Sequence, residues 1–267
     1  MARKSQGRAD AGRCHPWGRK MTLLMTTDLD HLRVVLVRVR NPLNIGAAAR
    51  AMSNFGVSRL RVVNPYQVAF HEARSAVGAA ELLAKAEQYK SVAEAVADCA
   101  LVVGTTAVGH RELQHPLRRL ENGARIIRRQ LPLAPVALLF GSEKVGLSKQ
   151  DLSHCHWLMR IPTREEHASM NLAQAVAICL YELVRQGRVP LGKKVGARAT
   201  VGDVERITQI LLHTLGASGY VQPRSAAATE EKLRRMVRRL NLDARDAEVW
   251  LGMLRQIAWK LGRKIGG

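Results

Sequence analysis

The segment Val136-Ala-Leu-Leu-Phe140-Gly141-Ser-Glu143-Lys-Val-Gly146-Leu-Ser148 leads from a short apolar run directly into a glycine, a carboxylate and a second glycine. An apolar run of this length, bounded by turn residues, is typical of a strand that is buried on both faces. In open α/β sheets, ligands bind outside the carboxyl ends of the strands, and a glycine there lets a ligand approach the backbone closely. Alone, Gly-x-Glu-x-x-Gly is also compatible with a plain turn.

On both sides of this segment, short apolar runs alternate with helical patterns. The expected strands are residues 32–39, 60–63, 100–103, 136–140 and 157–161. The expected helices are residues 44–55, 71–89, 92–98, 121–131 and 171–186. This alternation predicts an α/β domain with a mainly parallel sheet over residues 31–187.

The ends of the chain differ from this domain in composition. Residues 1–30 are basic and are expected to form a flexible arm, whereas residues 188–201 combine glycine with lysine and arginine, as in a basic linker. Residues 202–267 carry apolar residues at helical spacing and are expected to form a small all-helical extension that binds RNA. The opposite faces of these helices are rich in arginine and lysine and would contact either solvent or RNA: Arg234, Arg235, Arg238, Arg239, Arg255, Lys260, Arg263 and Lys264.

Charge points to the class of partner. The 42 Lys and Arg against 22 Asp and Glu give a formal net charge of +20. Such an excess favours polyanions, because each basic group that approaches a phosphate releases condensed counterions. A generally basic proteome or a membrane surface are the plainer explanations. No apolar run approaches the roughly 18 residues of a membrane span, and the four cysteines form no Cys-x-x-Cys pair. A cytoplasmic protein with reduced thiols, without a membrane or DNA partner, is therefore expected.

Two further segments lie where a predicted strand meets a helix. In the first, Asn44-Ile-Gly46 opens a helix of small residues that carries Arg50; alone, it is compatible with an ordinary packing helix. In the second, Ile161-Pro-Thr is followed by Ala168-Ser169-Met170-Asn171, and Ser169 is the expected N-cap of the next helix. That helix is apolar nearly all round, which suggests contact with the sheet and with another subunit, or a buried crossover helix in a monomer.

Together, Asn-x-Gly-x-x-x-Arg (residues 44–50), Phe-Gly-x-Glu-x-x-Gly-Leu (140–147) and Ile-Pro-Thr…Ser-x-Asn-Leu-Ala (161–173) resemble the three motifs of the SPOUT class of RNA 2′-O-methyltransferases. Within that class the chain most resembles the TrmJ type, which methylates the ribose of nucleotide 32, a cytidine or uridine, in the tRNA anticodon loop. The resemblance implies a sheet threaded as a trefoil knot, a homodimer, tRNA as substrate and S-adenosylmethionine as methyl donor. The helical tail, with Leu215-Gly-Ala-Ser-Gly-Tyr220, also resembles that type.

The resemblance also implies roles for individual residues. The cofactor would be held by strand-end and loop positions: Thr105, Thr106, Ala107, Gly141, Ile161, Ala168, Ser169 and Met170. Arg50 matches the essential arginine of the class; a guanidinium stays protonated, so gripping a phosphate and stabilising a developing alkoxide is its easier role. Ser169 and Asn171 would position the hydroxyl or the cofactor, Glu143 would orient Arg50, and Asn44 completes the catalytic set. Arg38 departs from the acidic residue that is often found after the first strand.

Three alternatives remain open. The first is a SPOUT enzyme that methylates rRNA or another tRNA position. The second is a non-catalytic RNA-binding protein with the same fold, which intact Arg50, Glu143, Ser169 and Asn171 disfavour. The third is metal chemistry at His154-Cys-His156, which is disfavoured because adjacent side chains diverge. No metal is expected.

Overall fold

The computed structural model describes residues 29–73, 79–107, 114–167, 169–185 and 197–265. Its central element is a seven-stranded sheet with the order β3-β2-β1-β6-β4-β7-β5, in which every strand pair is parallel. The strands are β1 (Leu32–Val37), β2 (Arg59–Val63), β3 (Glu87–Tyr89), β4 (Leu101–Thr105), β5 (Leu117–Arg119), β6 (Val136–Phe140) and β7 (Trp157–Arg160). The predicted α/β class with a parallel sheet is confirmed.

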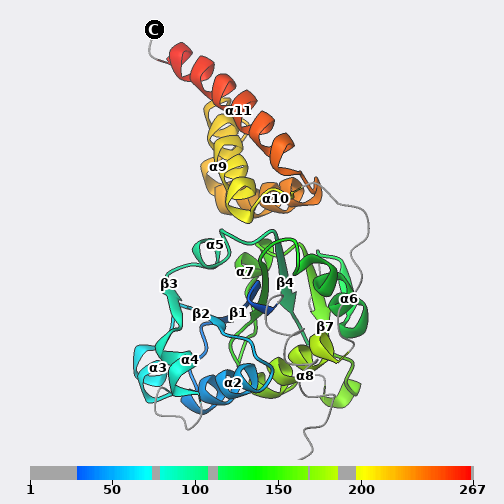
Figure 1. Cartoon of the computed structure of the whole chain (residues 1–267). Coiled ribbons are helices and arrows are strands. Elements are labelled where there is room, and N and C mark those ends of the chain that lie inside the picture. The colour runs from blue at the N-terminus through cyan, green and yellow to red at the C-terminus, as the bar shows by residue number, and fades with distance from the viewer. Residues whose placement is uncertain (1–28, 74–78, 108–113, 168, 186–196, 266–267) are drawn as a thin grey trace, which may run out of the picture.

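Helices cover both faces of the sheet and form a separate layer beyond one of them (Figure 1). The helices of the sheet domain are α2 (Pro42–Asn54), α3 (Gln67–Ala73), α4 (Ala80–Ala84), α5 (Val92–Ala95), α6 (Leu120–Gln130), α7 (Lys149–Ser153), η1 (Glu165–His167) and α8 (Leu172–Val184). The extension contains α9 (Val201–Ala217), η2 (Pro223–Ser225), α10 (Ala226–Arg239) and α11 (Ala244–Ile265). The all-helical extension is thus confirmed.

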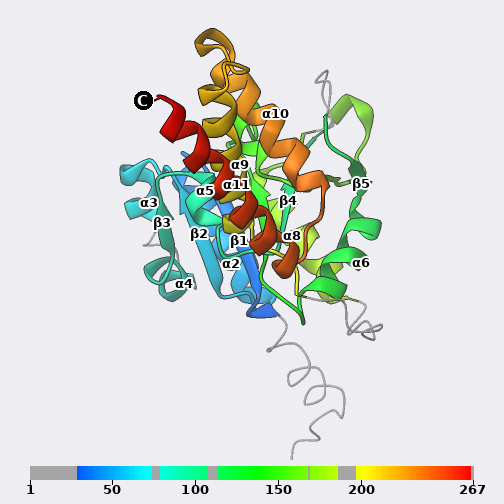
Figure 2. The same cartoon turned by 90° about the horizontal axis from the view of Figure 1, so that it is seen from above.

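Three apolar clusters hold these layers together. The largest lies between the sheet and α2, α6 and α8, and the second lies on the opposite face, under α5 and α7. Val201, the first residue of α9, joins this second cluster. The extension has its own cluster, in which Ile207, Val237 and Leu251 meet. Seen from above, α9, α10 and α11 overlie the sheet (Figure 2).

The strands that sequence analysis missed are the two edges of the sheet. Residues 87–89 were expected to end a helix but form β3, where Glu87 accepts from Arg61 Nε at 3.0 Å. Residues 117–119 form β5 and are all exposed. Edge strands are often short and polar, so neither carries the alternation that marks a half-buried strand.

One predicted helix start and one predicted N-cap also differ from the structure. Helix α2 begins at Pro42, because Asn41 caps it by accepting from Leu43 N at 2.9 Å and proline suits the first helical position. Helix α8 is capped by Asn171 and not by Ser169, since the Asn171 side chain accepts from Ala173 N at 2.9 Å.

The boundaries of the other predicted segments can be compared only in part. The arm 1–30 lies outside the described residues except for its last two, and the linker 188–201 is described only from residue 197. Arg198 forms a β-bridge with Asp243, and Thr200 caps α9, so this end of the predicted linker belongs to the extension. Cys99, Cys155 and Cys179 are buried free thiols. In the described part of the chain, no helix combines the length and apolar character needed to cross a membrane.

Candidate functional site

A pocket of about 580 Å³ lies at the carboxyl ends of three neighbouring strands, β4, β6 and β7. It contains most of the residues expected to bind the cofactor or act in catalysis: Asn44, Thr105, Thr106, Ala107, Gly141, Glu143, Ile161, Ser169, Met170 and Asn171. Two expected site residues are not in this set. Ala168 lies outside the described residues, and Arg50 does not line the pocket. The crevice at the strand ends is where ligands bind in parallel sheets.

The wall formed by β4 is fixed to its neighbours by hydrogen bonds. Thr105 Oγ1 donates to Leu139 O at 2.8 Å, and Thr106 N donates to Met159 O at 3.0 Å. The hydroxyl of Thr105 is therefore used to tie β4 to β6. This strand end is consequently a rigid edge beside which a flat ligand can lie.

The wall formed by the loop after β6 is a closed turn. Ser142 and Gly146 form an antiparallel bridge, with Gly146 N donating to Ser142 O at 2.8 Å, and Gly146 has a φ of +67°. A Cβ on Gly141 would lie 2.1 Å from the carbonyl carbon of Gly146 and 2.3 Å from Leu147 N. Position 141 therefore requires a glycine because the backbone of residues 146 and 147 packs closely against it. Glu143 is exposed at the tip of the turn.

We expect Gly141→Ala to disrupt this turn, because the peptide unit between Gly146 and Leu147 must move away from the added methyl group. The free energy of unfolding should fall by about 2 kcal/mol, and the Kd for S-adenosylmethionine should rise at least about tenfold by titration calorimetry. Gly216→Ala in α9 is the matched control, since a Cβ there meets nothing within 4 Å. Unchanged cofactor affinity in Gly141→Ala would show that the turn does not shape the pocket.

A chain of hydrogen bonds links the three sequence motifs across the pocket mouth. Asn171 Nδ2 donates to Asn44 Oδ1 at 2.9 Å, and Asn44 Nδ2 donates to Glu143 Oε1 at 3.0 Å. The direction of the chain is fixed at both ends, because Asn171 Oδ1 already accepts from the start of α8 and an ionised Glu143 can only accept. Asn44 and Asn171 are 127 residues apart in the sequence, and these bonds join the three motifs into one polar surface.

Arg50 lies outside this chain of contacts. It is exposed on α2, on the same outward side as Leu43 and Ala47, which are also exposed. Glu143 accepts from Asn44, and its expected orientation of Arg50 stays a prediction. Within a single chain, Arg50 therefore does not complete the pocket.

Arg38 has a structural partner that sequence reasoning did not identify. It directly follows β1 with a φ of +53°, and its guanidinium forms a double contact with the buried carboxylate of Asp151. Asp151 also accepts from the backbone and hydroxyl of Ser148, which completes a capping box at the start of α7. The Ser-x-x-Asp spacing signals the capping box in the sequence, but the arginine 113 residues away has no such signal.

His154, Cys155 and His156 point to different neighbours. His154 contacts Arg238 in the extension, Cys155 Sγ donates to Asp151 O, and His156 Nδ1 accepts from Val102 N at 3.0 Å. Burial lowers the pKa of His156 to about 3 and raises that of Cys155 to about 12. Among the described residues, no three His, Cys, Asp or Glu side chains are grouped so that they could hold a metal ion.

The pocket fits the expected cofactor in size and chemistry. Its volume falls within the range of small-molecule sites, roughly 300–1,000 Å³. Apolar side chains of Leu147, Leu152 and Met159 suit a flat base, while hydroxyls and amides suit a ribose and an amino-acid group. The carboxylate of Glu143 suits a positively charged sulfonium. The residues present could therefore hold S-adenosylmethionine.

Comparison with known proteins agrees with this geometry. Residues 31–181 match the SpoU rRNA Methylase family. The chain is 36% identical over 236 residues to the tRNA (cytidine/uridine-2′-O-)-methyltransferase TrmJ of Pectobacterium atrosepticum, covering 86% of this chain and 97% of that protein. The corresponding protein of Yersinia pestis (strain Pestoides F) is 37% identical over 238 residues and is covered to 92%. Among solved structures, TrmJ from Z. mobilis ZM4 superposes with a TM-score of 0.74 at 32% identity, covering 84% of this chain and 98% of that one.

Proposed function

The chain belongs to the SpoU rRNA Methylase family, and from that membership we propose that it is a methyltransferase that modifies the ribose 2′-hydroxyl of tRNA. The methyl donor is S-adenosylmethionine. The observation that carries this function is the pocket at the ends of β4, β6 and β7, where the three motifs meet in one chain of hydrogen bonds. Similarity to the tRNA-methylating relatives covers the extension as well as the sheet domain, which favours tRNA over rRNA.

The residues of the pocket perform the positioning that the reaction requires. The bound cofactor supplies an electrophilic methyl group. A ribose hydroxyl is a poor nucleophile, so it must be oriented and its developing charge stabilised. The chain Asn171–Asn44–Glu143 presents amide and carboxylate groups of fixed orientation beside the pocket. In this proposal Arg50 grips a neighbouring phosphate and stabilises the alkoxide, a role that its charge and fork of donors suit.

The proposed target is nucleotide 32 of the anticodon loop, a cytidine or uridine, and the proposed compartment is the cytoplasm. Bulk tRNA incubated with radiolabelled-methyl S-adenosylmethionine and then digested reveals the labelled position. Label in a 2′-O-methylated nucleotide 32 is the expected result. Label at another nucleotide of tRNA would support 2′-O-methylation of tRNA but contradict nucleotide 32 as the target. Cofactor binding without methyl transfer to tRNA would favour rRNA as the substrate. If the protein neither bound the cofactor nor transferred a methyl group, a non-catalytic RNA-binding protein would be favoured.

We also propose that the enzyme is a homodimer through the outward face of α2 and α8, and that the trefoil knot implied by the resemblance is present. These two helices pack together and expose Leu43, Ile178 and Tyr181, of which Leu43 is 79% exposed. Arg50 lies on the same outward side of α2. A dimer through this face brings Arg50 to the interface. There, Arg50 of one protomer would reach a substrate site that is shared with the pocket of the other protomer.

Tyr181→Asp is expected to weaken this dimer, because the new carboxylate would be buried without a partner. Tyr181 packs edge-on against Phe55, with ring centroids 6.4 Å apart, and is 56% exposed. The dimer dissociation constant should rise at least about tenfold by analytical ultracentrifugation. Tyr66→Asp, at a tyrosine of 55% exposure in the loop before α3, is the control. A parent chain that sediments as a monomer would contradict the proposal directly.

A further inference from the structure

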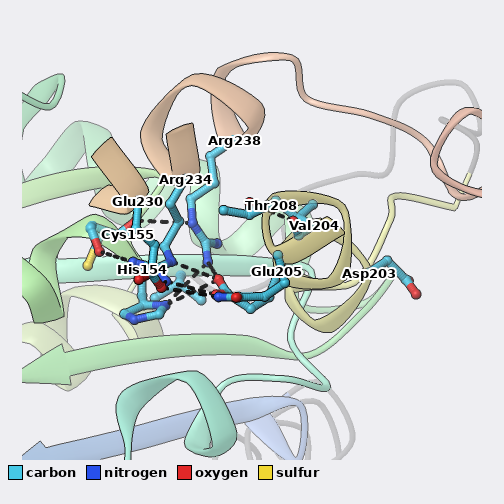
Figure 3. Close-up of polar contacts among 12 residues, drawn as sticks. His154, Cys155, Asp203, Val204, Glu205, Thr208, Glu230, Arg234 and Arg238 are labelled. Atoms are coloured by element: carbon cyan, nitrogen blue, oxygen red, sulfur yellow. Dashed lines mark hydrogen bonds and ion pairs between the residues drawn. The ribbon is translucent and has the colours of Figure 1, made fainter. Parts of the chain in front are cut away.

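A buried cluster of charged and polar side chains joins α7 of the sheet domain to the helical extension. It consists of Ser153 and His154 at the end of α7, Glu205 of α9, and Arg234 and Arg238 of α10, here called the junction cluster. Both arginines are only 4% exposed. They were expected on a face turned to solvent or RNA, but Figure 3 shows that they turn toward Glu205 and His154. Because they are buried, they do not act as phosphate contacts.

Arg234 makes a bidentate ion pair and a contact across the junction. Its Nε and Nη2 donate to the two carboxylate oxygens of Glu205, each at 2.8 Å, and its Nη1 donates to Ser153 Oγ at 3.1 Å. Burial raises the pKa of Glu205, but the hydrogen bonds from Arg234 and Gln209 outweigh it and lower that pKa to about 2. Glu205 is therefore ionised at neutral pH, and the pair has a defined geometry.

Arg238 binds the end of α7 directly. Its Nε donates to Ser153 O at 3.1 Å, and its Nη2 lies 3.5 Å from His154 Nδ1 and 3.7 Å from Glu205. Burial, followed by the nearby Arg238 and Arg234, lowers the pKa of His154 to about 3, so this imidazole is neutral. Arginine has no acceptor, so Nδ1 must accept. Burial lowers the pKa of Arg238 itself only to about 10, which leaves it charged at neutral pH.

Helix α7 lies between this cluster and the cofactor pocket. Leu147, just before the helix, and Leu152, within it, both line the pocket. Asp151 in the same helix holds Arg38 at the end of β1. Helix α7 therefore connects the junction cluster to the pocket wall, so an extension that is fixed to α7 has a defined place relative to the pocket.

The extension has a second attachment near the start of α9. Val201 N donates to Cys99 O at 2.8 Å, and Gly202 N donates to Ala97 O at 2.9 Å. One attachment would allow the extension to pivot, whereas two separated attachments restrict its orientation. The extension also has its own apolar cluster, so the junction cluster is not needed to form its core. A buried ion pair adds little stability over apolar packing, but its directional bonds specify geometry.

We propose that Arg234 and Arg238 are positioning residues, which hold the extension at a fixed orientation to the pocket so that a tRNA bound to the extension presents its ribose to the methyl donor. This inference rests on the proposed function. The two arginines act through Ser153, His154 and α7 rather than by touching RNA or cofactor. Loss of this orientation lowers the rate within the assembled complex, because small misplacements of reacting groups have large effects on rate.

The test compares Arg238→Met with Arg239→Gln, an exposed neighbour on the same helix, in the full chain. For Arg238→Met, the Kd for S-adenosylmethionine without tRNA should stay within about twofold, while the single-turnover rate at saturating tRNA falls about tenfold or more. For Arg239→Gln, we expect weaker tRNA binding with a salt slope reduced by about one and an unchanged saturated rate. Ser153→Ala removes the acceptor of Arg234 Nη1 and the hydroxyl bond to Gln150 O, but it keeps the backbone acceptor of Arg238. It should therefore lower the rate less.

A second readout is independent of activity. Hydrogen exchange at the amides of Val201 and Gly202 should be about tenfold faster in Arg238→Met and unchanged in Arg239→Gln. Unchanged exchange overturns the proposal, and so does a rate that recovers when tRNA is raised, since Arg238 would then be an ordinary RNA contact. If the parent chain methylates no tRNA, the proposed function fails, while the exchange rates still decide whether the cluster holds the extension.

Discussion

Replacing Arg50 by alanine is expected to reduce methyl transfer by about 100- to 1,000-fold, the effect of removing one group that stabilises charge developing on oxygen. Alanine favours helix more than arginine does, so α2 should remain intact. Arg50 does not line the pocket of its own chain, so cofactor affinity should change by no more than about twofold. Single-turnover transfer to tRNA and titration with S-adenosylmethionine measure the two quantities separately.

The control for Arg50 is an arginine of similar exposure far from the site. Arg125→Ala on α6 is exposed and should retain the parent rate. Arg50→Lys should recover only a small part of the activity, since an ammonium cannot form the bidentate contact of a guanidinium. If Arg50→Ala transfers methyl groups at the parent rate, the resemblance has assigned the wrong residue.

Replacing Asn171 by aspartate is expected to reduce transfer by about 100-fold while leaving the fold intact. Aspartate is as good an N-cap as asparagine, so its side chain can still accept from Ala173 N at the start of α8. It cannot donate to Asn44, and it places a second carboxylate close to Glu143. The effect should therefore fall on the rate and not on the free energy of unfolding.

Asn171→Ala separates these two roles. It removes both the cap and the donor, so it should lose about 1 kcal/mol of stability in addition to the rate. Urea unfolding and single-turnover transfer, measured on both variants, give the comparison. Equal rates for Asn171→Asp and the parent would show that the hydrogen bond to Asn44 has no part in catalysis.

The fold could be predicted where buried apolar runs carry the signal. All five expected strands are present, because strands such as β6 are apolar throughout and end at clear turn residues. The short edge strands β3 and β5 could not be predicted, since each has only three residues, is partly or fully exposed and carries no apolar run. The trefoil knot stays a prediction from resemblance, because local periodicity contains no information about threading.

For the candidate site too, the positions that follow apolar strands could be predicted from the sequence, and the contacts between distant segments could not. The pocket residues follow the ends of β4, β6 and β7, which the apolar runs had located, and the structure brings them together. Their individual roles stay predictions. Helical spacing placed Arg234 and Arg238 opposite an apolar stripe, but it could not show that Ser153 and His154 lie on that side. Contacts between distant segments, such as Arg38 with Asp151, are beyond what local sequence patterns reveal.

The most direct test of the central claim uses two tRNA transcripts that differ by one oxygen atom. One carries a ribose at nucleotide 32, and the other carries a 2′-deoxyribose at that nucleotide alone. With labelled S-adenosylmethionine, the account predicts transfer of about one methyl group to the first transcript and none to the second, while both bind the protein with similar affinity. Equal labelling of the two transcripts would contradict the account, because the methyl group would then have another acceptor.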